Sequence, residues 1–218
     1  MNYDFSQLKV FNKSRKVTAN IFGYHMVWRE PNSTPKDGTI VGEVQNLSGN
    51  FEFAIPIVID EQTLAITHQP KLFFIYDDSD YCKGSWICLS RKFYSDLIEN
   101  NNLISLIWHE VGHFHTLQYF KFKTNDEIRM ERKKCVLDEN DILAEEKAAD
   151  LFAVMYCHSE PWIEAINYNI AERRKMMIDS NRTGAVRELT MRKKYIKSLK
   201  DNDYEIETAL YELLNSSK

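Results

Sequence analysis

The sequence lacks any apolar segment long enough to cross a membrane. Its longest uninterrupted apolar run is Leu151–Cys157, whereas a spanning helix needs roughly 20 such residues. The first residues, Met1–Phe5, contain no basic segment followed by an apolar stretch, which is the pattern of a secretory signal. We therefore expect a cytoplasmic protein without a membrane partner.

Cysteine is scarce, and its spacing is uninformative about metals. The four cysteines form no CxxC pair, and without an export signal they are expected to be reduced and packed as small apolar side chains. They are Cys82, Cys88, Cys135 and Cys157.

An excess of positive charge is also absent. The chain has 28 Lys and Arg against 32 Asp and Glu, a net charge of −4 with the signs interspersed, which argues against a nucleic-acid partner. Its 44% hydrophobic and 28% charged content is ordinary for a globular protein and excludes wholesale disorder. Three short basic clusters are interpreted as solvated helix faces: Arg132–Lys134, Arg173–Lys175 and Arg192–Lys194.

The first ninety residues are rich in short β-type segments. A Ser48–Asn50 turn between two of these segments predicts a hairpin, and the polar stretch Asp77–Gly84 is expected to be a loop. The predicted strands are Val17–Trp28, Thr39–Leu47, Phe51–Asp60, Lys71–Tyr76 and Ser85–Ser90.

After Ser90 the apolar spacing changes to that of helices. Apolar residues from Leu103 to Phe114 form one stripe, which predicts a helix over about 102–120 with Asn102 as its N-cap. Further helices are expected from Thr124, from Asp138–Asp141 to Cys157, from Ser159, over Val186–Leu199 and over Tyr204–Leu214. Strands followed by helices indicate an α+β fold with an antiparallel or mixed sheet. We expect one domain over 1–218, with a β-rich lobe at 1–90 and a helical lobe at 91–218.

A metal-binding pattern lies inside the first predicted helix. Residues 108–113 read Trp-His-Glu-Val-Gly-His and contain HExxH. Histidines at i and i+4 project from one helix face, so His109 and His113 can reach a single Zn²⁺ ion. Glu110 lies beside them and can take a proton from a metal-bound water. The spacing predicts two metal ligands and a general base.

A catalytic zinc ion needs a third protein ligand. His115 points about 200° around the helix from His113, so it is a poor candidate. The extended pattern HExxHxxGxxH is excluded, because Thr116 and Tyr119 occupy the required Gly and His positions.

The better candidate for the third ligand lies on the third predicted helix. Glu146 and Asp150 are one turn apart, and the alanines between them would allow close approach to the HExxH helix. Glu146 can bind zinc while Asp150 accepts the N–H of a ligand histidine. Glu145 stays open as an alternative ligand.

The HExxH motif followed by ExxxD resembles the gluzincin group of metallopeptidases. The string Glu146–Ala153, EKAADLFA, is similar to the ExxADxFA signature of the CAAX-prenyl-protease type with its soluble relatives, and to phage-repressor-cleaving ImmA-type peptidases. The resemblance covers about residues 84–157. It implies a zincin-like fold, zinc bound by His109, His113 and Glu146, catalysis by Glu110, and a supporting role for Asp150.

The expected activity is zinc-dependent hydrolysis of a peptide or protein substrate by a soluble endopeptidase, a regulatory protease of bacterial or phage origin. Gly84–Ser90 is the expected edge strand for substrate. The alternative is a non-catalytic zincin-fold binding module, or a structural phage protein with an incidental motif. Candidate donors to the oxyanion are Tyr156, His158, Arg182 and Arg187, of which Arg187 is preferred.

Overall fold

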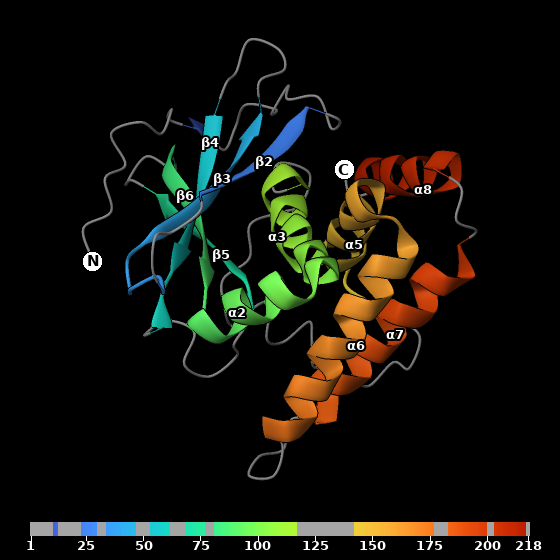
Figure 1. The fold of residues 1–218 in the computed structure, drawn as a ribbon. Helices are drawn as coiled ribbons and strands as arrows, with labels where there is room; N and C mark the ends of the chain where they lie inside the picture. The colour runs from blue at the N-terminus through green and yellow to red at the C-terminus, as the bar shows by residue number, and fades with distance from the viewer. Residues whose placement is uncertain are drawn as a thin grey trace. The chain divides into compact units, whose positions relative to one another are not determined.

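The computed structural model describes residues 11–12, 23–29, 34–46, 53–61, 69–76, 81–116, 142–176, 183–199 and 203–216. The chain divides into two compact units, residues 1–99 and 100–218 (Figure 1). All described strands lie in the first unit, and the second unit is helical where it is described. The predicted α+β class is therefore confirmed.

The first unit is built on a mixed sheet of six strands in the order β1-β6-β4-β3-β2, with β5 paired to β6. Only the β4–β6 pair is parallel among the described strands. The strands are β1 (Phe11–Asn12), β2 (Tyr24–Trp28), β3 (Ile40–Asn46), β4 (Phe53–Ile59), β5 (Lys71–Tyr76) and β6 (Tyr81–Leu89).

The predicted hairpin is confirmed as the antiparallel pair β3 and β4, in which Val44 lies opposite Ile55. Both side chains are fully buried, so one apolar face fixes the register of the pair. Gly42 permits close packing with β2, because a Cβ atom there would lie 2.9 Å from a ring carbon of Trp28. The turn at residues 48–50 lies outside the described residues.

Strand β6 differs from its prediction in two ways. It begins at Tyr81, so residues 81–84 continue the strand and are not the expected loop. It is also not an edge strand, because Ile87 and Cys88 pair with β4 on one side and with β5 on the other. Their side chains are fully buried, as in a central strand. A peptide therefore cannot add to β6 at these residues.

A helix that the sequence analysis did not predict follows β6. Helix α2 spans Arg91–Glu99 and buries Phe93 and Leu97. Its start is fixed by Ser90, whose Oγ accepts a hydrogen bond from the Phe93 N–H at 3.0 Å. The sequence analysis assigns Ser90 to the preceding strand, but in the structure it is the N-cap of α2.

The second unit is arranged around one central helix, α5, which contacts α3, α6, α7 and α8. Its middle carries alanines and apolar side chains that are buried, so neighbouring helices can approach it closely. The elements are the 3₁₀ helix η1 (Asn101–Leu103), α3 (Ile104–Thr116), α5 (Ala144–Cys157), α6 (Ser159–Met176), α7 (Thr183–Ser198) and α8 (Asp203–Ser216).

The helix starts differ in detail from their predictions. Asn100, and not Asn102, is the N-cap, and its side chain accepts a hydrogen bond from the Asn102 N–H because a 3₁₀ turn precedes α3. Helix α5 begins without a side-chain cap, but Glu145 and Glu146 in its first turn interact favourably with the helix dipole. The helix expected from Thr124 and the start at Asp138–Asp141 lie outside the described residues.

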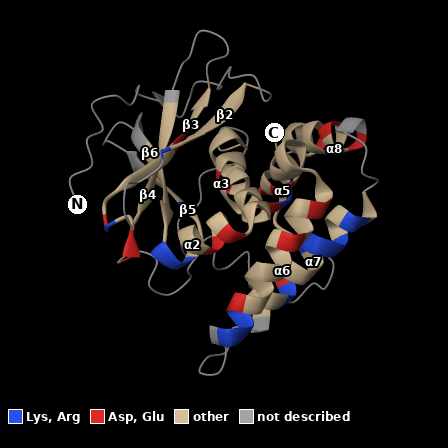
Figure 2. Cartoon of the chain, in the orientation of Figure 1, with Lys and Arg blue, Asp and Glu red and all other residues tan. Residues whose placement is uncertain are grey.

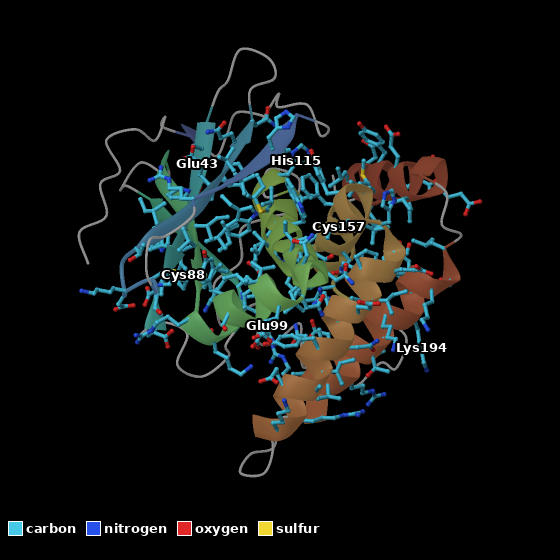
Figure 3. All side chains as sticks on the ribbon, in the orientation of Figure 1. Glu43, Cys88, Glu99, His115, Cys157 and Lys194 are labelled. Carbon is cyan, nitrogen blue, oxygen red and sulfur yellow. The ribbon has the colours of Figure 1, made fainter. Side chains whose placement is uncertain are left out.

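Within the described part of the chain, no helix is both long and apolar enough to cross a membrane. The described thiols Cys88 and Cys157 are free. Lys and Arg residues gather along α6 and α7 (Figure 2). Arg174 is exposed, and so is Lys194, which Figure 3 labels, as predicted for solvated faces.

Candidate metal centre

Helix α3 places its two motif histidines on the same side, one turn apart. The ring centroids of His109 and His113 lie 4.6 Å apart in an edge-to-face arrangement. Their Nε2 atoms are 3.1 Å apart. This is the i, i+4 geometry that lets two imidazoles on one helix share a metal ion.

Helix α5 adds a carboxylate to this pair. Glu146 Oε2 lies 3.4 Å from His109 Nε2 and 3.8 Å from His113 Nε2. Among the described residues, these three side chains form a group whose ligand atoms all lie within 4.8 Å of one another, close enough to hold a metal ion. Glu145, the alternative ligand, is not part of this group.

The spacing of the three atoms fits a small tetrahedral ion. Nitrogen and oxygen ligands about 2.0–2.1 Å from a tetrahedral zinc ion lie roughly 3.3 Å from one another. The observed separations of 3.1, 3.4 and 3.8 Å bracket this value. Two imidazoles and one carboxylate are also the donor set of many catalytic zinc sites. The residues therefore fit zinc, although the spacing does not identify the metal.

Close contact between α3 and α5 brings these ligands together. A Cβ atom at Gly112 would lie 2.8 Å from the Ala149 Cα and 2.9 Å from the Ala149 carbonyl oxygen. Only glycine fits at that point, because the contact is with backbone that cannot rotate away. Gly112 directly precedes the ligand His113, and Ala149 lies three residues after Glu146, so this contact fixes the distance across the site.

Asp150 supports the centre from behind. Its side chain is fully buried, and Oδ1 lies 2.9 Å from His109 Nδ1. A hydrogen bond from Nδ1–H to this oxygen orients the ring so that His109 Nε2 faces Glu146 and His113. A carboxylate in this position fixes the histidine tautomer and increases its strength as a ligand.

Arg192 on α7 completes the cluster, and the sequence analysis missed it. Its side chain is 7% exposed, so the prediction that Arg192–Lys194 is a solvated face is wrong at Arg192. The guanidinium binds Asp150 through Nε and Nη2 and lies 2.9 Å from Glu146 Oε2 through Nη1. The only sequence feature that could have indicated its burial was its periodic position on an amphipathic helix. We call His109, His113, Glu146, Asp150 and Arg192 the polar cluster.

The charges of the cluster shift the pKa values of its two histidines in opposite directions. For His109, burial and the charge of Arg192 oppose protonation, but Asp150 and Glu146 outweigh them and raise the pKa to about 9. For His113, partial burial and then the charge of His109 lower the pKa to about 4. Two rings this close share one proton between them.

Glu146 stays ionised in this setting. Its burial favours the neutral acid, but Arg192 and the His109 hydrogen bond prevail and hold its pKa well below the usual range. The carboxylate is therefore available as an anionic ligand at neutral pH, which is the state that metal binding requires.

Solvent reaches the cluster from one side. The His113 side chain is 27% exposed, whereas the side chains of His109, Glu146 and Arg192 are between 7% and 9% exposed. A metal ion bound here would be enclosed on the Arg192 side and accessible beside His113. An accessible position distinguishes catalytic zinc sites from closed structural ones.

The other predicted residues lie in varied surroundings. Glu110 follows His109 on α3 and is partly exposed. Tyr156 stacks on Trp108, with ring centroids 4.1 Å apart.

His158 is the exposed C-cap of α5, with a φ of 65°. Arg187 is partly exposed on α7, and its position five residues before Arg192 directs it about 140° away around that helix. Their catalytic roles stay predictions, and Arg182 lies outside the described residues.

His115 belongs to a different part of the α3–α5 contact. It is buried, and its ring lies 5.3 Å from that of Phe152. Burial lowers its pKa to about 4, so it is neutral at physiological pH. Figure 3 labels it on α3. Its place outside the metal-ligand group agrees with the helical geometry expected from the sequence.

No family model matches the chain, and neither a curated protein nor a solved structure matches it. The resemblance to gluzincins therefore depends only on the motif residues and on the cluster that they form.

Proposed function

We propose that this protein is a zinc-dependent peptidase of the gluzincin kind. The observation that carries the proposal is the convergence of His109 Nε2, His113 Nε2 and Glu146 Oε2 at separations suited to one tetrahedral ion. The partly exposed side at His113 leaves room for water and a substrate carbonyl. A zincin-like fold, a cytoplasmic location and a peptide or protein substrate are parts of the same proposal.

The residues of the site have separate roles in the proposed reaction. Zinc bound by His109, His113 and Glu146 would polarise the substrate carbonyl and lower the pKa of a bound water towards about 7. Glu110, next to His109 on α3, accepts a proton from the attacking water at its carboxylate and returns it to the leaving amine. Asp150 holds the His109 ring through Nδ1 and keeps Nε2 free for the metal.

Metal content tests the centre itself. The purified protein should bind about one equivalent of zinc, and His113→Ala should lose it, because one ligand of three is removed. His113 is the most exposed ligand, so this variant disturbs the buried charges least. Glu146→Gln should weaken zinc binding strongly, and the matched variant Glu145→Gln should leave it nearly unchanged. A wild-type protein without affinity for zinc would exclude the proposal.

Cleavage tests the catalytic step. Wild type and Glu110→Gln are each incubated with a proteome-derived peptide library, and new termini are identified by mass spectrometry. The variant should keep its zinc and lose cleavage by a factor of about 10² to 10⁴, because only the general base is removed. Zinc binding with identical, background cleavage by both proteins would favour a non-catalytic binding module instead.

A further inference from the structure

Arg192 has no task in the proposed chemistry, although it is a buried cation within the metal centre. Its side chain is 7% exposed, and its guanidinium contacts three members of the polar cluster. Burying a charge is costly unless its partners compensate for it. The number and identity of those partners show which negative charges the guanidinium of Arg192 compensates.

Asp150 is the main partner. Arg192 Nε donates to Oδ2 at 2.7 Å, and Nη2 donates to Oδ1, which makes a two-point contact between planar groups. The same Oδ1 faces His109 Nδ1 at 2.9 Å. Arg192 therefore holds the carboxylate that orients the first histidine.

Glu146 is the second partner, and the contact involves its metal-facing oxygen. Arg192 Nη1 lies 2.9 Å from Glu146 Oε2, the atom that faces the Nε2 atoms of both histidines. Arg192 Nη2 also lies 3.2 Å from His109 Nδ1. A metal ion in this site would share its only ligand carboxylate with a neighbouring positive charge.

We infer that Arg192 is a built-in counter-ion of the metal centre, which stabilises Glu146 and Asp150 within the fold and lowers the affinity of the site for a divalent cation. The inference rests on the proposed metal centre. Two buried carboxylates one turn apart repel each other, and a fixed cation between them removes that repulsion without a metal. The same cation repels an incoming metal ion, so the stability of α5 and α7 is gained at the expense of metal affinity.

Zinc affinity measured by competition with a chromogenic chelator tests this inference. Arg192→Met should bind zinc about tenfold more tightly than wild type, or better, because a nearby positive charge is lost. Arg192→Lys should stay within about threefold of wild type, because it keeps the charge while losing the two-point contact. Lys194→Met, an exposed lysine on the same helix, is the matched control and should change nothing.

A second pair of variants avoids the risk that Arg192→Met fails to fold. In the Asp150→Asn background only Glu146 remains as a buried carboxylate, and the amide oxygen can still accept a hydrogen bond from His109 Nδ1. Adding Arg192→Met to Asp150→Asn should again tighten zinc binding about tenfold or more. Thermal melting with zinc and with chelator should show a larger zinc-induced rise in Tm for the double variant than for Asp150→Asn.

The outcomes separate the two proposals. Unchanged or weaker zinc binding on removal of Arg192, in both backgrounds, would overturn the counter-ion role and leave the metal centre standing. Zinc binding by the Arg192 variants but not by wild type would support the counter-ion role and count against peptidase activity in the wild type. If neither wild type nor any variant binds zinc, the metal centre fails, and the counter-ion role fails with it.

Discussion

The contact between α3 and α5 has two regions that bury a histidine in opposite ways. In the polar cluster, carboxylates overcome the effect of burial and raise the pKa of His109 to about 9. Six residues later, His115 lies beside the ring of Phe152, and burial lowers its pKa to about 4. We call Trp108, His115, Phe152 and Tyr156 the aromatic layer.

The difference shows that burial alone does not make a site. The aromatic layer keeps its histidine neutral, because that is the cheaper state in apolar surroundings. The polar cluster keeps ionised groups buried by pairing each of them, as the low pKa of Glu146 and its contact with Arg192 indicate. Of the two, only the polar cluster brings two imidazole nitrogens and an ionised carboxylate together, and a metal ion that binds there must displace the proton on His109.

The largest expected effect comes from unpairing a buried charge in the polar cluster. Asp150→Ala removes the main partner of Arg192 and should lower the free energy of unfolding of the zinc-free protein by about 3–5 kcal/mol. Glu145→Ala, on the same helix and partly exposed, is the control and should cost less than about 0.5 kcal/mol. Urea denaturation measures both. A loss below about 1 kcal/mol for Asp150→Ala would mean that the pairing contributes little to stability.

In the aromatic layer, we expect the contribution of His115 to stability to depend on pH. Because the pKa of folded His115 is about 4 and its ordinary value is 6.5, the unfolded chain takes up a proton between these pH values and the folded chain does not. The stability that neutral His115 contributes is present above pH 6.5 and is lost as the pH falls towards 4, on the order of 3 kcal/mol.

His115→Phe should remove that part of the acid sensitivity. The difference in unfolding free energy between variant and wild type, measured in zinc-free buffer from pH 7 to pH 4, should shift in favour of the variant as the pH falls. A difference that stays constant over this range would show that His115 titrates normally in the folded protein.

A smaller loss of stability is expected from a change at Gly112, where the polar cluster and the aromatic layer meet. Gly112→Ala adds a Cβ atom that meets the Ala149 backbone, so the helices must separate; we expect a cost of about 2 kcal/mol despite the better helix propensity of alanine. Zinc affinity should fall as well, because the ligands come from both helices. Adding Ala149→Gly should not restore stability, since the clash is with backbone atoms. Recovery in that double variant would place the clash at the Ala149 side chain.

The smallest effect is expected from Tyr156→Phe. Tyr156 stacks on the rings of Trp108 and Phe152, and phenylalanine preserves both of these ring contacts. Stability should change by less than about 1 kcal/mol, and peptide cleavage should stay near the wild-type rate. A loss of about a hundredfold in kcat with unchanged stability would instead assign the hydroxyl to the oxyanion, as the sequence analysis allowed.

Local pattern was sufficient to predict much of the molecule. The spacing of apolar residues predicted α3 and the later helices, and the turn signal at Ser48–Asn50 between two β-type segments predicted the β3–β4 hairpin. HExxH and the Glu146–Asp150 pair also identified the groups that the structure brings together. These predictions succeeded because side chains one helical turn apart share a face whatever else the chain does.

The errors at β6 and at Arg192 have a common cause. The interior position of β6 depends on β4 and β5, and its partners cannot be identified from its own residues. The role of Arg192 likewise depends on Asp150, 42 positions earlier in the chain. An arginine beside two lysines on an amphipathic helix has the pattern of a solvated face until the packing of α7 against α5 is known.

The sequence by itself determined which residues could bind a metal, because the ligand chemistry and the one-turn spacing are both local properties. Only the tertiary structure decided that Glu146 faces both histidines, that Gly112 sets the approach of α5, and that Arg192 is buried beside them. The physical reason is that charge compensation acts between atoms close in space, and α3, α5 and α7 come close only after folding.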